Sequence, residues 1–191
     1  SAVEAVGEIA KSEDEAKQYA AIKSLSDWSG PEAVDVLIET AKKSASMRNK
    51  ILSIRGAVSL TDKYQMSNDA KIGVYSEVLG LCERDDEKRL VISGLSKIRD
   101  MKSLEILGGM LDDEVLNNDV SVAIAQIVCG DDENDKLFGG VEAGKLLEKA
   151  AENIRDEKLR ERAEMCSEKL TLGRRGFESI FNGQDLSGWK G

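Results

Sequence analysis

The stretch RDDEKRLVISGLSKIRDMKSLEILGGMLDD, residues 84–113, decides the fold class of this chain. Its apolar residues recur at spacings of three and four, which places them on helix faces, and the pattern breaks at Arg99-Asp100. We expect Asp85 or Asp86 to cap the first helix, because a carboxylate accepts the free N–H groups of the first turn. The two apolar faces comprise Leu90, Val91, Gly94, Leu95 and Ile98 in the first helix and Leu104, Leu107 and Leu111 in the second. Two such short helices cannot bury both faces alone, so stacked neighbours are expected.

The rest of the chain contains looser copies of this helix pair. Helices are expected over residues 2–10, after a capping box at 12–15, after Pro31, from near Ser46, on both sides of a connection at 62–68, from near Val115, after an acidic loop at 130–140, and over 157–170. Gly108 and Gly109 lie inside the second helix of the opening stretch. Since glycine costs about 1 kcal/mol in a helix interior, they predict a close approach of a neighbouring helix.

The copies recur at a regular step. Aligning Leu25, Leu60, Ile98 and Ile127 gives steps of 35, 38 and 29 residues, the length of two-helix repeats. The segments GPEAVDVLIETA (30–41) and DEKRLVISGLSKIRDMKSLEIL (86–107) resemble HEAT repeats, of the divergent kind found in large bacterial exported proteins. This resemblance covers about residues 12–170. It implies an all-α, right-handed α-α superhelix of about four to five HEAT-like helix pairs over residues 1–170.

Composition supports a helical protein and disfavours several classes of partner. One proline and 4% aromatic residues argue against an all-β sandwich. The 36 acidic and 27 basic residues give a net charge of −9, which disfavours nucleic acids and anionic membrane surfaces. A DNA-processing HEAT-like enzyme, which needs a basic groove, is therefore disfavoured. No apolar run approaches the roughly 20 residues that span a bilayer, since residues 120–129 are interrupted by Ser121 and Gln126.

The end of the chain changes character. Residues 171–176 have the composition of a linker, and GFESIFNGQDLSGWKG (176–191) shows an alternating pattern with a turn at Asn182-Gly183. This segment resembles the opening of the 3-keto-disaccharide hydrolase domain family, a concanavalin-like jelly roll. The fitting residues are Gly176, Phe177, Ser179, Phe181, Asn182, Gly183, Asp185, Leu186, Ser187, Gly188 and Trp189, whereas Ile180 and Gln184 depart from the phrase. The resemblance implies that residues 177–191 are a truncated β stub of a β-sandwich domain whose catalytic residues lie beyond Gly191.

Catalytic, cofactor-binding and metal-ligating residues are not assigned within the 191 residues. Histidine, the commonest acid–base group and transition-metal ligand, does not occur in the sequence, and the carboxylates lie on exposed helix faces. The run DDEND at 131–135 offers oxygen ligands for calcium but lacks the spacing of a calcium loop, so we interpret it as a solvated loop. Cys82, Cys129 and Cys166 are far apart and odd in number, and we interpret them as small buried hydrophobic residues rather than a disulfide or metal framework.

Several other residues have two interpretations. Arg55 is expected to pair with a carboxylate between repeats, with substrate binding as the alternative. Trp28 lies at a repeat turn, and Trp189 is expected to pack into the following domain, with stacking on a sugar as the alternative. Arg174 and Arg175 are linker charges that could instead pair with the acidic repeats. The solvated faces of the second helices form the default surface for a protein partner, and their charged residues include Glu39, Lys42, Lys43, Lys145, Glu148, Lys149 and Glu152.

These observations predict a non-catalytic spacer or protein-interaction module within a larger exported bacterial protein. The resemblance of the β stub implies that the parent cleaves glycosidic bonds and that carbohydrate contacts only the missing downstream domain. An extracytoplasmic location, whether periplasmic, cell-surface or secreted, is implied by the same resemblance. The alternative is a stand-alone protein–protein scaffold without an enzymatic parent. An intact domain after Gly191 separates the two hypotheses.

Overall fold

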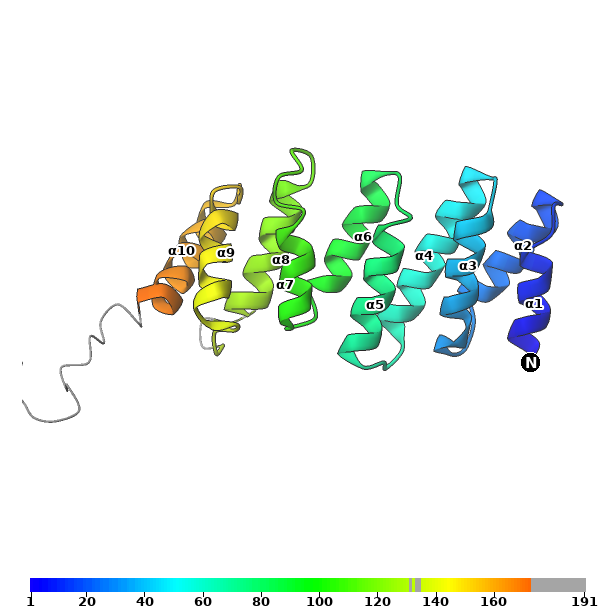
Figure 1. The fold of residues 1–191 in the computed structure, drawn as a ribbon, viewed down its shortest axis with the longest axis horizontal. Coiled ribbons are helices and arrows are strands. Elements are labelled where there is room, and N and C mark those ends of the chain that lie inside the picture. The colour runs from blue at the N-terminus through cyan, green and yellow to red at the C-terminus, as the bar shows by residue number, and fades with distance from the viewer. Residues whose placement is uncertain (131, 133–134, 173–191) are drawn as a thin grey trace, which may run out of the picture.

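The described part of the chain is all-α, as the sequence predicts. The structure, a computed structural model, describes residues 1–130, 132 and 135–172 (Figure 1). These residues form ten α-helices and one short 3-10 turn, and no strand occurs among them. The elements are α1 (Ala2–Ala10), α2 (Glu15–Ser26), η1 (Pro31–Ala33), α3 (Val34–Lys43), α4 (Met47–Lys63), α5 (Asn68–Leu79), α6 (Asp85–Leu95), α7 (Met101–Gly108), α8 (Asn117–Cys129), α9 (Gly140–Ala151) and α10 (Glu157–Leu172).

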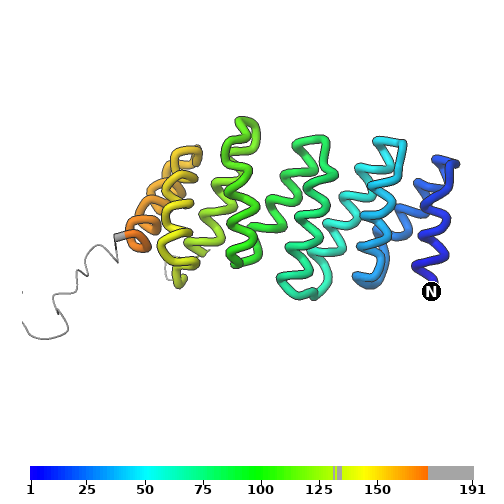
Figure 2. Tube along the Cα trace, in the orientation of Figure 1, coloured from blue at the N-terminus to red at the C-terminus, as the bar shows by residue number. Residues whose placement is uncertain are grey.

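The helices follow one another in chain order along the longest axis of the molecule (Figures 1 and 2). Each helix packs against its neighbour in the chain, and most helices two apart also pack together. Contacts run from α2 through α4, α6 and α8 to α10, and the second layer contains α1, α3, α5, α7 and α9. The arrangement leaves α1 and α10 at opposite ends. The predicted β stub lies outside the described residues.

A continuous apolar core fills the space between the two layers. The predicted faces supply its largest fully buried side chains, among them Ile22, Leu25, Leu37, Ile54, Leu60, Leu95, Leu104, Leu107, Ile124 and Ile127. In α6, one position differs from the expected apolar face. Leu90 is 39% exposed, and Ile92, two residues later on α6, is buried instead. Spacings of three and four residues fit a face that includes Leu90 as well as one that includes Ile92. The pattern alone therefore could not separate the flank of the helix from its buried face.

Two predicted helix caps are wrong. The cap of α2 is Asp14, whose Oδ1 accepts from the backbone N–H groups of Ala16 (3.0 Å) and Lys17 (3.2 Å). Ser12, the expected cap, instead accepts from the N–H of Asp14 at 3.2 Å. Asp and Ser are equivalent cap formers, and the helix begins at the later one.

The second error concerns α6, which begins at Asp85 and has Arg84 at its cap position, where no side chain accepts a hydrogen bond. Asp85, Asp86 and Glu87 therefore all lie in the first turn rather than at the cap position. Their negative charge still favours the positive end of the helix dipole. The predicted break at Arg99-Asp100 is confirmed, because Asp100 caps α7 by accepting from the N–H of Lys102 at 2.9 Å.

The glycines of α7 need a different account from the expected backbone approach. A Cβ on Gly108 would lie 3.1 Å from the Cδ1 of Leu146, so the close neighbour is a side chain of α9 rather than its backbone. Gly109 follows the last residue of α7 and would meet only carbonyl oxygens of its own helix. Leu111 lies beyond the helix and is half-buried.

Side-chain hydrogen bonds between successive helix pairs repeatedly join residues 28 to 37 positions apart. Asn49 on α4 donates to the Gln18 side chain on α2 at 2.7 Å, 31 positions away. Arg89 on α6 donates to Asp119 on α8 at 2.9 Å, 30 positions away. Tyr64 donates to the carbonyl of Trp28 at 3.0 Å, 36 positions away. These separations match the 29 to 38 residue step of the sequence, so equivalent positions of neighbouring pairs lie side by side.

Two arginines hold the chain where it leaves α8. Arg99, in the α6–α7 turn, donates through Nε to the carbonyl of Ile127 at 3.1 Å and through Nη2 to that of Lys136. Arg162 on α10 donates through Nη2 to the carbonyls of Cys129 (3.2 Å), Gly130 (3.0 Å) and Asp132 (2.7 Å). The last carbonyls of a helix have no partner within it, so these contacts satisfy groups that the helix leaves open.

Candidate functional site

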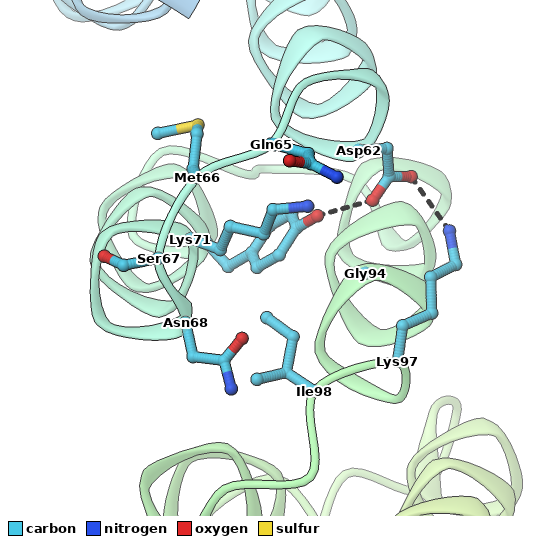
Figure 3. A pocket seen from close by; sticks show the side chains of 10 residues that line it. Asp62, Gln65, Met66, Ser67, Asn68, Lys71, Gly94, Lys97 and Ile98 are labelled. Atoms are coloured by element: carbon cyan, nitrogen blue, oxygen red, sulfur yellow. Dashed lines mark hydrogen bonds and ion pairs between the residues drawn. The ribbon is translucent and has the colours of Figure 1, made fainter.

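The strongest candidate site is a polar cleft formed where the end of α4, the start of α5 and the end of α6 meet (Figure 3). Its volume is about 500 Å³, which is enough for a protein side chain or a small polar ligand. Its lining consists of Asp62, Gln65, Met66, Ser67, Asn68, Lys71, Tyr75, Gly94, Lys97 and Ile98. The cleft therefore combines residues of two successive helix pairs.

Tyr75 on α5 is buried, and its ring packs against α6 next to Gly94. A Cβ on Gly94 would lie 2.5 Å from the Cζ of Tyr75, so only a glycine at position 94 leaves room for the tyrosine ring. The Tyr75 hydroxyl donates to the Oδ1 of Asp62 at 2.5 Å. Burial, followed by this hydrogen bond and the charge of Asp62, raises the pKa of Tyr75 far above its ordinary value. The phenol thus stays protonated and acts as a fixed donor.

Asp62 is held on both of its oxygens. Its Oδ1 accepts from Tyr75, and its Oδ2 lies 3.0 Å from the Nζ of Lys97 (Figure 3). A carboxylate engaged in this way positions its neighbours and has little capacity left to accept a proton from a ligand. Lys71 also lines the cleft and makes no ion pair within the described part of the chain. The cleft consequently offers a free ammonium group together with amide and hydroxyl groups, which suits a polar or anionic partner.

The structural role predicted for Arg55 from the sequence is confirmed. Arg55 on α4 donates through Nε (3.0 Å) and Nη2 (2.7 Å) to the Oε1 of Glu87 on α6. Glu87 is 1% exposed, so the pair lies between two successive helix pairs with its carboxylate in the core. Trp28 also takes its predicted place at a turn, where its Nε1 donates to the Oε1 of Glu32 at 2.9 Å.

The predicted partner faces on α3 and α9 are exposed. The Nζ of Lys42 lies 2.8 Å from the Oε1 of Glu39 on its own helix and 2.6 Å from the Oε1 of Glu77 on α5. Lys43 lies 3.2 Å from Glu39, and the charged residues named on α9 are likewise exposed. These faces are solvated, and the structure does not bring them together with the cleft residues into one cluster of catalytic groups.

The remaining predicted residues divide into three groups. Cys129 and Cys166 are buried and Cys82 is half-buried, and none of the three forms a disulfide in the structure. Of the run DDEND at 131–135, Asp132 and Asp135 are described, and the N–H of Asp132 donates to the Asp135 carboxylate at 3.0 Å. Arg174, Arg175 and Trp189 lie outside the described residues. Within residues 1–130, 132 and 135–172, no group of three His, Cys, Asp or Glu side chains is placed to hold a metal ion.

The sequence analysis did not predict the cleft. It placed Asp62 in the connection at 62–68 and Tyr75 on the apolar face of the next helix, and nothing in the pattern indicated that the two side chains are in contact. One usable signal was present, because an aspartate lies two residues after three of the four aligned positions, at Asp27, Asp62 and Asp100. Comparisons of the chain with family models, with curated proteins and with solved structures gave no match. No helix in the described part has both the length and the apolar character needed to cross a membrane.

Proposed function

We propose that this chain is a non-catalytic, HEAT-like α-solenoid that serves as a spacer and protein-interaction module. The observation that carries the proposal is the recurrence of side-chain bonds at one-repeat separations, as in Asn49–Gln18, Arg55–Glu87 and Arg89–Asp119. A stack in which each pair contacts mainly its neighbours is the basis of repeat proteins, and their extended surfaces bind other proteins. A right-handed superhelix of four to five pairs is part of the proposal.

The cleft supports a binding role rather than a chemical one. Its carboxylate is engaged by Tyr75 and Lys97, and its phenol stays protonated. General acid–base catalysis requires a group that exchanges a proton near the working pH. Lys71 and the surrounding amides instead suit a carboxylate or another polar side chain of a protein partner, one that enters between two helix pairs.

The larger setting of the module is proposed from its sequence. Residues 177–191 resemble the opening of a 3-keto-disaccharide hydrolase domain, so the parent is proposed to be an exported bacterial protein that cleaves glycosidic bonds. In this arrangement the helical region holds the hydrolase domain at a distance and binds a protein neighbour. Carbohydrate would contact only the downstream domain.

The test compares three proteins made from the gene that encodes this chain. They are the chain extended to the end of the reading frame, the same protein without residues 1–170, and residues 1–172 alone. Hydrolysis of ordinary and 3-keto disaccharides is followed by product chromatography. We expect equal turnover from the two extended proteins and none from residues 1–172. Turnover that requires residues 1–170 would contradict a non-catalytic spacer, and a reading frame that stops soon after Gly191 would contradict the hydrolase parent.

The stand-alone scaffold is the second candidate, and one observation favours keeping it. The cleft and the charged faces of α3 and α9 all lie within the helical region, so they can bind a partner without any downstream domain. The reading frame separates the two candidates, because only the scaffold is compatible with a stop soon after Gly191.

A further inference from the structure

The setting of Lys71 differs from that of the other half-buried lysines. Three lysines of the described chain are half-buried, namely Lys50, Lys71 and Lys88. Lys50 pairs with Glu83, and the Nζ of Lys88 lies 3.5 Å from the Oδ1 of Asp85. The Lys71 side chain makes no ion pair or hydrogen bond within the described residues. Partial burial of an ammonium group without a counter-charge is unfavourable, so this side chain favours an anion from outside.

Two carboxylates close to Lys71 are held by other partners. Asp62 lines the same cleft, and its Oδ2 lies 3.0 Å from the Nζ of Lys97. Asp69 comes two residues before Lys71, and its Oδ1 lies 2.5 Å from the Nζ of Lys102. Both carboxylates are therefore positioned by other lysines, and the charge of Lys71 is not balanced by either.

The net charge of the cleft fits a ligand with a single negative charge. Its charged lining consists of Asp62, Lys71 and Lys97, because the Tyr75 hydroxyl keeps its proton and donates it to Asp62. One aspartate and two lysines give the cleft a net charge of +1, in a chain whose overall charge is −9. A carboxylate neutralises this charge. A phosphate monoester carries about −1.5 to −2 near pH 7, so it leaves excess negative charge beside Asp62.

Neutral donors complete the polar lining around Lys71 (Figure 3). The side-chain amides of Gln65 and Asn68 make no hydrogen bond within the described residues. The Oγ of Ser67 accepts from the backbone N–H of Ala70 at 3.2 Å, which leaves its own proton free to donate. A carboxylate has two oxygens with about four acceptor sites, so one ammonium group and several neutral donors match it.

Apolar surfaces lie beside these polar groups. Met66 is half-buried, Ile98 and the ring of Tyr75 are buried, and all three line the cleft. They can cover the aliphatic stem of an acidic side chain while its carboxylate contacts Lys71. The cleft, at about 500 Å³, is larger than one side chain, so part of the backbone that carries it can enter as well.

We propose that the cleft binds the carboxylate of a glutamate or aspartate side chain that a protein partner presents, with Lys71 as its charged contact. The inference rests on the proposed function, because it takes the helical region to be a protein-interaction module, and it adds the chemistry that the partner carries. The bound side chain contacts Lys71 on α5 and Ile98 after α6, so it joins two successive helix pairs.

The test titrates the isotope-labelled chain with two blocked tripeptides, acetyl-Gly-Glu-Gly-amide and acetyl-Gly-Gln-Gly-amide, and follows the backbone amide shifts by NMR. We expect the glutamate peptide to bind in the millimolar range and about tenfold more tightly than the glutamine peptide, because its hydrogen bonds are charge-assisted. The shifts should be concentrated in residues 65–71 and 94–98.

Two matched variants show whether Lys71 is the charged contact. Lys71→Gln should abolish the preference for the glutamate peptide. Lys23→Gln removes the same charge from an exposed position on α2, outside the cleft, and should leave the preference unchanged. The preference should also weaken at high salt, since the cleft is open to solvent.

Three results would overturn the proposal. One is the absence of a preference between the two peptides, including no binding of either. Another is tighter binding of inorganic phosphate than of the glutamate peptide, which would assign the cleft to a different anion. The third is binding of acetate as tight as that of the peptide, which would assign it to a free carboxylic acid.

All three results come from the unsubstituted chain, so a variant that folds poorly does not decide the outcome. None of them bears on disaccharide hydrolysis, so this inference and the proposed function can fail separately.

Discussion

Arg55 on α4 and Glu87 on α6 form an ion pair in which a half-exposed guanidinium meets a carboxylate that is 1% exposed. Both hydrogen bonds from Arg55 end on Oε1, at 3.0 and 2.7 Å, and Oε2 receives no hydrogen bond. The Nε of Arg84 lies 3.7 Å from Oε2, which is an ion-pair distance but too long for a hydrogen bond. Arg55 is thus the principal partner of a buried charge.

Removal of Arg55 should therefore be costly. Arg55→Met leaves the Glu87 carboxylate buried without its main partner, and we expect the free energy of unfolding to fall by about 3 kcal/mol. The double variant Arg55→Met/Glu87→Met should recover most of this loss, because two apolar side chains replace the pair. Urea unfolding measures both. Lys43→Ala, which removes an exposed pair with Glu39, serves as the control and should change stability by less than about 0.5 kcal/mol. A double variant no more stable than Arg55→Met would refute this account.

Two helical glycines should respond in opposite directions to the same substitution. Gly94→Ala places a Cβ 2.5 Å from the Cζ of Tyr75, and we expect it to destabilise the protein by about 1–3 kcal/mol. Gly73→Ala on α5 meets nothing within 4 Å and should stabilise by about 0.5–1 kcal/mol, because alanine favours the helix. The melting temperatures of the two variants, measured beside that of the parent protein, test this prediction. Equal shifts of the same sign would show that Tyr75 does not rely on Gly94.

The buried phenol of Tyr75 predicts an effect at alkaline pH. The pKa of Tyr75 is raised in the folded protein, first by burial and then by Asp62, while the unfolded value is about 10. Its contribution to stability is therefore fully present below pH 10 and is lost as the pH rises above 10. Tyr75→Phe should cost about 1 kcal/mol at pH 7, and this difference should shrink by up to about 1.4 kcal/mol per pH unit above pH 10.

Urea titrations of the parent and Tyr75→Phe between pH 7 and pH 11 measure the difference directly. The folded state must persist over this range, which the far-ultraviolet circular dichroism at zero denaturant checks. A difference that stays constant to pH 11 would mean that the phenol ionises equally in the folded and unfolded states.

Arg162 predicts a large effect from a single side chain near the end of the described chain. Arg162→Gln removes the charged donor to the carbonyls of Cys129, Gly130 and Asp132, and we expect a loss of about 2 kcal/mol. Arg160 on the same helix makes no side-chain hydrogen bond or ion pair within the described residues, so Arg160→Gln is the matched control. Hydrogen exchange should show faster exchange at the C-terminal end of α8 only in Arg162→Gln. Equal behaviour of the two variants would rule out the anchoring role.

Much of this fold follows from local patterns. Spacings of three and four place Leu37, Ile54 and Leu104 in the core, and an arginine next to an apolar face predicts the pair formed by Arg55. Both inferences need only the geometry of a single helix. The same reasoning failed for Ser12 and Asp14, because two cap formers that lie two residues apart are chemically equivalent, and the local pattern does not decide which of them caps the helix.

The cleft depends on relations between helix pairs. Tyr75 reaches Asp62 only because Gly94, on the next pair, leaves room for its ring. The steps between the aligned positions vary from 29 to 38 residues. A periodic sequence with a variable step does not specify which positions come into register. The cleft could therefore be found only from the three-dimensional arrangement of the helices.

The two layers of helices are linked by different chemistry, and this gives the stack a built-in dependence on salt. Exposed pairs, Lys42–Glu77 at 2.6 Å and Lys102–Asp69 at 2.5 Å, join α3 to α5 and α5 to α7. Buried groups, among them Asn49 and Glu87, join α2 to α4 and α4 to α6. Dissolved ions screen exposed pairs far more than buried ones. Higher ionic strength should therefore weaken the exposed links from α3 to α5 and from α5 to α7 more than the buried links from α2 to α4 and from α4 to α6. The exposed Arg89–Asp119 pair, which joins α6 to α8, should weaken as well.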